Sequence, residues 1–140
     1  MKLFIKQNSA YLAWAIALLS MVGSLYFSEV KNFAPCILCW FQRMAIYPLV
    51  FLIPVGILRK DTKLADYVLP LSIIGLAISI FHNLLYYKVI PEAVAPCVNG
   101  VSCTTHFVEY FGFITIPLLS FFALALITTL MFVHKKSHAN

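Results

Sequence analysis

The sequence predicts an all-α integral membrane protein, a four-transmembrane-helix bundle. Of its 140 residues, 62% are hydrophobic and only 11% are charged, and the mean hydropathy is +0.92. A water-soluble domain has roughly twice this share of charged residues. The apolar residues form four stretches of about 20, the length that crosses a bilayer as a helix. Only tails and short loops remain, so we expect one membrane domain over residues 1–140.

The first span is expected at about 9–29. Lys2 and Lys6 precede it, as in a signal peptide, but the apolar run is too long and lacks a small-residue cleavage site. We therefore interpret it as a retained helix. Hydropathy gives the other three spans at about 40–58, 67–90 and 111–133.

Two spans contain rows of small or polar residues at helical spacing, which allow helix backbones to approach closely in lipid. One row lies in the first span and the other in the third. They are Ala13, Ala17, Ser20 and Ser24, and Ser72, Gly75, Ser79 and His82. The sequence thus predicts a compact bundle with these rows at the helix contacts.

The distribution of basic residues predicts the orientation, because loops rich in Lys and Arg stay in the cytoplasm. Lys31 and Lys88 are the only loop cations on one side of a four-span arrangement. The other side has Lys2, Lys6, Arg59, Lys60, Lys63, Lys135 and Lys136. We therefore expect a multi-pass protein of the cell membrane, with both termini cytoplasmic and outer loops at about 30–39 and 91–110.

Charge also argues against two classes of function. The net charge of +5 is spread over tails and a turn, so nucleic acid is not an expected partner. A transporter or channel usually has an ionisable residue at mid-membrane. Glu29, Glu92 and Glu109 all fall in outer loops or at span ends, which disfavours transport.

All four cysteines, Cys36, Cys39, Cys97 and Cys103, lie in the two outer loops or at their edge. Cysteines confined to the oxidising side of a membrane indicate disulfide chemistry. The first two form a C-x-x-C motif, a spacing that suits a reducible disulfide. The second two enclose Asn99-Gly100, a turn signal that brings them together.

Three interpretations of the cysteines remain open. In the first, the disulfides are structural, and one that closes the short stretch from Cys97 to Cys103 would add only about 2 kcal/mol of stability. A zinc ion held by the four thiolates, with His106 as a spare ligand, would be a closed structural site. The favoured interpretation is electron exchange between the pairs. Cys97 and Cys103 lie in a loop long enough to meet a protein, whereas Cys39 adjoins the membrane and suits a lipid-soluble oxidant.

Two polar residues are candidates for a site beside the C-x-x-C motif. Arg43 lies one helical turn after Cys39, where a guanidinium is placed to stabilise a thiolate or to bind a quinone oxygen. The alternative is an arginine that extends to the lipid headgroups. His82 lies on the small-residue row of the third span, where it is placed to relay protons or simply to link helices.

Aromatic and polar neighbours have two interpretations as well. Trp40 and Phe41 suit packing on a quinone ring, or an interfacial aromatic belt. Asn83, Tyr86 and Tyr87 suit the lining of a polar site, or the same belt.

The segment Pro35-Cys36-Ile37-Leu38-Cys39-Trp40-Phe41-Gln42-Arg43 resembles the signature of the DsbB family of quinone-dependent disulfide-generating membrane proteins. The resemblance extends over the whole chain, including Phe111 to Pro117 at the start of the fourth span. It is greatest to the short Gram-positive form called BdbC, with counterparts of Tyr67 to Pro70 and of His82. Unlike the larger Gram-negative form, this chain has Gln42 in place of a glutamate, and its outer cysteines are closely spaced.

The resemblance implies a thiol:disulfide oxidoreductase. Cys97 and Cys103 would oxidise an extracytoplasmic thioredoxin-fold thiol oxidase, DsbA-like or BdbD-like, and so drive disulfide formation in exported proteins. Electrons would pass to Cys36 and Cys39 and then to a quinone of the menaquinone or ubiquinone type near Arg43. A reductase running in the opposite direction and a scaffold with structural disulfides remain as alternatives, since direction depends on reduction potentials.

Overall fold

The computed structural model describes residues 1–32, 34–94 and 115–139, and this part of the chain is helical with no strand. Its elements are α1 (Lys2–Leu25), the π-helical turn η1 (Tyr26–Val30), α2 (Ile37–Leu58), α3 (Leu64–Tyr86), the 3₁₀ turn η2 (Glu92–Val94) and α4 (Ile116–Ala139). Four helices are long and apolar enough to cross a membrane: Asn8–Val30, Ile37–Leu58, Leu64–Tyr86 and Ile116–Ala139. The predicted all-α four-span bundle is confirmed.

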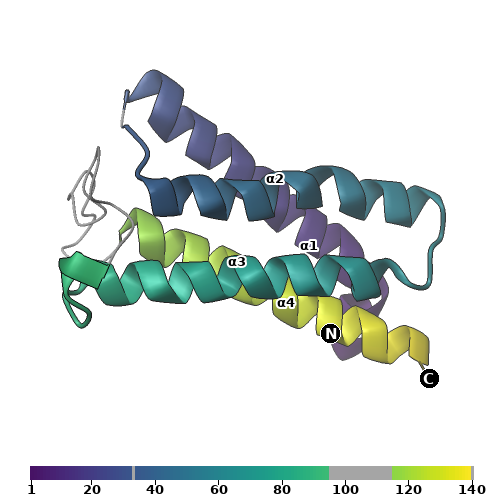
Figure 1. Ribbon diagram of the computed structural model, residues 1–140. Coiled ribbons are helices and arrows are strands. Elements are labelled where there is room, and N and C mark those ends of the chain that lie inside the picture. Colours follow the sequence, from purple (N-terminus) through teal and green to yellow (C-terminus); the bar gives the residue numbers. More distant parts are fainter. Residues whose placement is uncertain (33, 95–114, 140) are drawn as a thin grey trace.

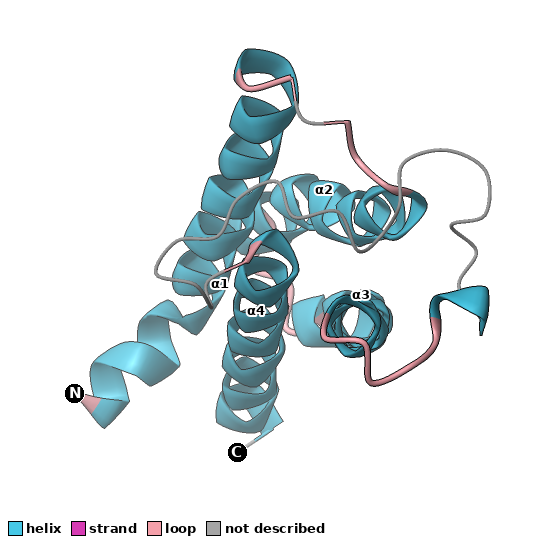
Figure 2. Cartoon of the chain, turned by 90° about the vertical axis from the view of Figure 1, so that its left-hand side faces the viewer, coloured by secondary structure: helices cyan, strands magenta, loops and turns pink. Residues whose placement is uncertain are grey.

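The four helices alternate in direction. Both termini therefore lie at one end of the bundle, together with the turn between α2 and α3 (Figure 1). Each helix packs mainly on two others, in the cyclic order α1, α2, α3, α4, as the end-on view of Figure 2 shows. The opposite end of α2 holds the C-x-x-C motif.

The small-residue rows lie where the helices meet. Ala13 and Ala17 are fully buried, as are Ser72 and Ser79, and His82 is only 1% exposed. A Cβ atom on Gly75 would lie 2.8 Å from Cβ of Ala45 on α2. Glycine at this position therefore sets the close approach of α3 to α2.

A proline in α2 creates a contact with α1. Pro54 has no N–H and cannot donate to the carbonyl of Val50, four residues earlier. The indole Nε1–H of Trp14 donates to this carbonyl instead, at 3.1 Å. The proline thus provides a hydrogen-bond acceptor that joins two helices inside the apolar core.

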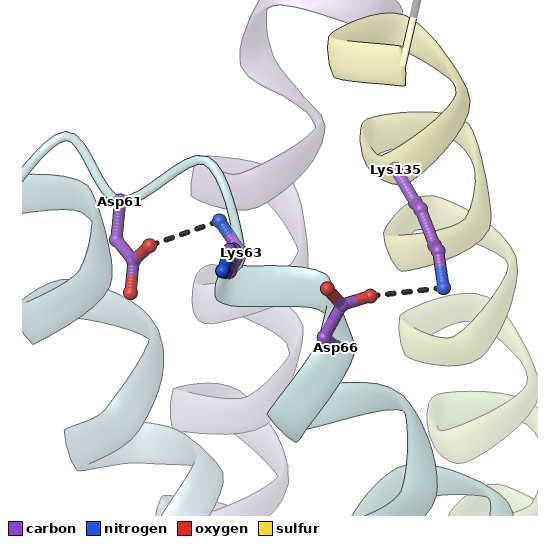
Figure 3. Close-up of polar contacts among 4 residues, drawn as sticks. All are labelled: Asp61, Lys63, Asp66 and Lys135. Atoms are coloured by element: carbon purple, nitrogen blue, oxygen red, sulfur yellow. Dashed lines mark hydrogen bonds and ion pairs between the residues drawn. The ribbon is translucent and has the colours of Figure 1, made fainter.

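The α2–α3 turn is held by local polar contacts (Figure 3). Asp61 Oδ1 accepts a hydrogen bond from the backbone N–H of Lys63 at 2.9 Å, and Asp66 pairs with Lys135 of α4 at 2.9 Å. Both members of the ion pair are about half exposed, so it adds little stability.

Several helix boundaries differ from the ranges expected from hydropathy, and two of them lie at the end of the bundle that holds the C-x-x-C motif. α2 begins at Ile37 rather than near residue 40, because Cys36 has extended backbone angles and serves as the N-cap. α3 ends at Tyr86 rather than near residue 90, and Lys88 then adopts a positive φ of 58° that turns the chain. Both cysteines of the motif are therefore fixed to the first turn of α2.

Candidate functional site

The candidate site begins with the two thiols at the N-terminus of α2. Cys36 is the N-cap and is only 6% exposed, and Cys39 lies one turn into the helix and is partly exposed. Both are free thiols, with their sulfur atoms 3.2 Å apart. Because helical geometry brings residues three apart to one face, the C-x-x-C spacing holds the pair ready to form a disulfide.

The environment favours the thiolate form of Cys36. A hydrogen bond from the Cys39 thiol is the main cause that lowers the pKa of Cys36 well below its usual range, and His82 lowers it further. Burial opposes both effects without cancelling them. A thiolate is the form that attacks disulfides and electrophiles, so Cys36 is the candidate nucleophile of the pair.

His82 approaches the same sulfur from α3. Its Nε2 atom lies 3.8 Å from Sγ of Cys36, within hydrogen-bond reach for sulfur. The expected position of His82 inside the bundle is correct, and the fold brings it to the C-x-x-C motif.

Gln42 is a buried polar neighbour that the sequence reasoning did not select. The Nε2 atom of Gln42 lies 3.2 Å from Nδ1 of His82. The Oε1 atom of Gln42 accepts a hydrogen bond from the Ser120 hydroxyl of α4 at 2.9 Å. Helical spacing in the sequence could have identified it, because Gln42 shares a helix face with Leu38, Ala45 and Leu49, which are all buried. A polar residue on the buried face of a span calls for a partner.

Arg43 points toward α1. Its Nε donates to Ser24 Oγ at 2.8 Å and its Nη2 to the Ser24 carbonyl at 3.1 Å, and the guanidinium lies 5.5 Å from the centre of the Trp40 ring. These contacts hold the guanidinium of Arg43 against α1 and beside Trp40. Ser24 comes from the small-residue row of α1, so this row also supplies a polar contact.

A cavity of about 430 Å³ lies beside these residues. Side chains from all four helices line it, most of them apolar. Its polar lining includes Cys36, Cys39, Gln42, Arg43, Tyr47, His82 and Ser120. The volume falls within the range of small-molecule sites.

Tyr47 is a second residue that the sequence reasoning missed. It lines the cavity one turn after Arg43, and its buried hydroxyl has no hydrogen-bond partner among the described residues. An unpaired buried hydroxyl is costly, so this group suits a ligand with an acceptor oxygen. The sequence signal was its i+4 spacing from Arg43.

The aromatic and polar neighbours proposed from the sequence differ in whether they line the cavity. Trp40 and Phe41 do not line the cavity and are 55% and 44% exposed, which favours the aromatic-belt interpretation for both. Tyr86 lines the cavity, whereas Tyr87 is 51% exposed. Asn83 donates to the backbone carbonyls of Ser79 and Pro117 and so joins α3 to α4.

One group of side chains bears on the zinc interpretation of the cysteines. Donor atoms of Cys36, Cys39 and His82 lie within 4.8 Å of one another. Within the described ranges this is the only such group, and it offers three donors where a closed zinc site has four. The other predicted ligands, Cys97, Cys103 and His106, lie outside the described residues.

Known proteins resemble this chain over most of its length. The family model for disulfide bond formation protein DsbB matches residues 6–134. The chain is 46% identical over 121 residues to disulfide bond formation protein C of Bacillus subtilis, covering 86% of this chain and 88% of that protein. It is 40% identical to a probable disulfide formation protein C of Halalkalibacterium halodurans, covering 89% and 92%.

A third relative comes from another genus. The probable disulfide formation protein of Metapseudomonas resinovorans is 37% identical, covering 92% of this chain and 90% of that protein. No solved structure matches the chain significantly. The length of the family match and the identity to several full-length relatives show that this chain belongs to the DsbB family of disulfide bond formation proteins.

Proposed function

We propose that this membrane protein is a quinone-reducing thiol:disulfide oxidoreductase that reoxidises an extracytoplasmic thioredoxin-fold thiol oxidase. The observation that carries the proposal is the shared cavity, because Cys36, Cys39 and Arg43 all line it. Electrons would move from the partner to Cys97 and Cys103, then to Cys36 and Cys39, and then to the quinone.

The cavity fits a quinone headgroup. Its volume of about 430 Å³ and its mostly apolar lining suit a flat hydrophobic ring. Arg43 and the hydroxyl of Tyr47, which has no partner among the described residues, are hydrogen-bond donors for carbonyl oxygens. Arg43 and Tyr47 are four positions apart in α2, a rise of about 6 Å along the helix. This distance is comparable to the length of a quinone ring. A bound quinone supplies a two-electron acceptor.

The thiol chemistry belongs to Cys36 and Cys39. When the dithiol becomes a disulfide, one S–S bond forms, and two electrons and two protons leave the pair. The thiolate of Cys36 is the nucleophile, and His82 Nε2 at 3.8 Å accepts the Cys36 proton. The disulfide is returned to the dithiol by thiolate attack from the outer pair, which passes through a mixed disulfide and leaves Cys97 and Cys103 joined.

Arg43 has a positioning and electrostatic role in this proposal. Ser24 fixes its guanidinium through two hydrogen bonds, so its charge is oriented before a ligand enters. A preoriented positive charge in an apolar cavity stabilises negative charge on sulfur or oxygen more strongly than it would in water.

Sequence features support the proposed side of the membrane and, with it, the proposed partner. The excess of Lys and Arg on the side of the termini supports an extracytoplasmic C-x-x-C motif. A thioredoxin-fold dithiol protein on that side would reach Cys97 and Cys103 first. The proteins that finally receive disulfides would be exported proteins.

A single-turnover experiment tests the electron step. The Cys97→Ser/Cys103→Ser variant is reduced, freed of reductant and mixed with menaquinone or ubiquinone analogues in detergent. We expect one quinone reduced per chain, with Cys36 and Cys39 becoming a disulfide. The same protein with Cys39→Ser should reduce none. Equal reduction by both proteins, or none by either, would contradict the proposal.

A further inference from the structure

The buried amide of Gln42 lies between two groups that each have more than one way to hydrogen-bond. On one side is Nδ1 of His82, at 3.2 Å. On the other is the Ser120 hydroxyl, which lies 2.9 Å from Gln42 Oε1 and also 2.9 Å from the carbonyl of Pro117. One hydroxyl proton cannot donate to both oxygens, so the network has two arrangements.

In the first arrangement, Ser120 donates to Gln42 Oε1. The amide Nε2–H then donates to Nδ1 of His82. A neutral imidazole that accepts at Nδ1 has its proton on Nε2, and Nε2 is the atom that faces Cys36. The ring therefore acts as a donor to the Cys36 sulfur, which suits the thiolate.

In the second arrangement, Ser120 donates to the Pro117 carbonyl. The amide turns over, so that its N–H donates to Ser120 Oγ and its oxygen accepts from Nδ1–H of His82. The oxygen and nitrogen of an amide are nearly equal in size and exchange places with little movement. Nε2 then presents a lone pair to Cys36, which suits the thiol.

We propose that Gln42 is a positioning residue for His82, and that its amide, oriented by Ser120, lets the ring present either an N–H or a lone pair to Cys36. This inference deepens the proposed function and rests on it for the role of His82 as proton acceptor. In the step concerned, the Cys36 S–H bond breaks, a new N–H bond forms at Nε2, and the electron pair stays on sulfur. The imidazolium then has a proton on each nitrogen, and Gln42 Oε1 accepts the one on Nδ1.

The network is built for more than joining helices. Asn83 already links α3 to α4 by donating to the carbonyls of Ser79 and Pro117 at 2.8 and 3.0 Å. Gln42 is only 4% exposed and His82 only 1%, so both side chains are largely shielded from bulk solvent. Without Gln42, the imidazolium form of the ring would lose the acceptor that the amide oxygen offers at Nδ1.

The direct test is the protonation state of the His82 ring nitrogens. We would record ¹⁵N spectra of the reduced protein in detergent with labelled histidine, at one fixed pH for all variants. The His82→Ala variant assigns the signals. In the natural protein we expect the Nδ1 shift between the protonated and unprotonated values, because the network has both arrangements. In Gln42→Glu the carboxylate only accepts, so the Nδ1 shift should move to the protonated value.

The matched control for this spectrum is Ser72→Ala. Ser72 is a fully buried hydroxyl on the same helix as His82, and it donates within that helix to the Leu69 carbonyl. Its loss should leave the His82 shifts unchanged. A His82 signal that is the same in the natural protein and in Gln42→Glu would overturn the proposal.

A second readout is alkylation of Cys36 by iodoacetamide, followed by peptide mass spectrometry in the Cys97→Ser/Cys103→Ser protein. Gln42→Leu should raise the pH midpoint of alkylation by about one unit, so that the rate falls by about tenfold at pH values below the midpoint of the natural protein. Gln42→Glu should restore the rate, and Ser72→Ala should not change it. If Gln42→Leu lowers the melting temperature yet leaves this rate unchanged, Gln42 is only structural and the proposal fails.

Both readouts are independent of quinone and of any partner protein. If the natural protein does not reduce quinone, the proposed function fails while the spectra and alkylation rates still decide the role of Gln42. If quinone is reduced but the Gln42 variants change neither readout, only the inference about Gln42 fails.

Discussion

The sulfur of Cys36 lies 3.8 Å from Nε2 of His82, although the two residues are 46 positions apart in the sequence. The contact exists because the small residues of α3 let it pack closely against α2, which brings the last turns of α3 beside the first turn of α2. It joins a nucleophilic sulfur and a titratable ring within the interior of a membrane bundle.

The thiolate of Cys36 should persist at low pH. Since the hydrogen bond from Cys39 lowers the pKa of Cys36, its alkylation should stay fast as pH falls from 9 to 7 and slow only on further acidification. Cys39→Ala removes the main cause, so the midpoint of the pH profile should rise. Alkylation rates measured across pH in the Cys97→Ser/Cys103→Ser protein check this. A midpoint near the ordinary thiol value in the protein that keeps both Cys36 and Cys39 would contradict this prediction.

Arg43→Ala should weaken the use of quinone. Loss of a charge-assisted hydrogen bond costs about 2 kcal/mol, which corresponds to about a 30-fold rise in the KM for quinone. Arg43→Lys keeps the charge but cannot form both bonds to Ser24, and we expect an intermediate KM. Steady-state kinetics with a soluble quinone analogue measure both. An unchanged KM in Arg43→Ala would assign the arginine a purely structural role.

Tyr47→Phe should reduce quinone affinity without harming the fold. The variant removes a hydroxyl that has no partner among the described residues, so no hydrogen bond within that part of the protein is lost. We expect affinity to fall about fivefold, equivalent to about 1 kcal/mol. Quenching of tryptophan fluorescence by the bound quinone provides the measurement. Tyr11→Phe, at a position 56% exposed on α1, is the control and should bind as the natural protein does.

Gly75→Ala should destabilise the bundle by about 1 to 3 kcal/mol. The added methyl would lie 2.8 Å from Cβ of Ala45 and 3.1 Å from a methyl group of Leu124, so the helices must separate. Gly23→Ala is the matched control, because a Cβ there meets nothing within 4 Å. Unfolding in detergent, followed by circular dichroism, should show a loss of stability only for Gly75→Ala. Equal stability of the two variants would contradict the packing argument.

The fold was predictable because hydropathy and helix length leave few alternatives for a chain of this composition. The rows of small residues also predicted the helix contacts, because Ser72, Gly75 and Ser79 recur on one helix face. The sequence did not predict that Cys36 is the N-cap of α2, because hydropathy reports burial in lipid and not the position of an N-cap.

The site was only partly predictable. Cys36, Cys39 and Arg43 are near one another in the chain, so helical spacing alone brings them to one region. Gln42, Tyr47 and Ser120 gain their significance from contacts across helices that a sequence pattern does not specify. Only the assembled helices show that the Tyr47 hydroxyl has no partner among the described residues. The same is true of the two acceptors within reach of the Ser120 hydroxyl.

The most direct test of the central claim is quinone absorbance during turnover with a reduced thioredoxin-fold dithiol protein, in detergent. The account predicts continuous quinone reduction by the natural protein, and none by Cys36→Ser or by Cys97→Ser/Cys103→Ser. The double variant should still reduce one quinone per chain in the absence of the partner. Steady reduction of quinone by Cys36→Ser, or by the double variant at the natural rate, would contradict the proposed route of electrons.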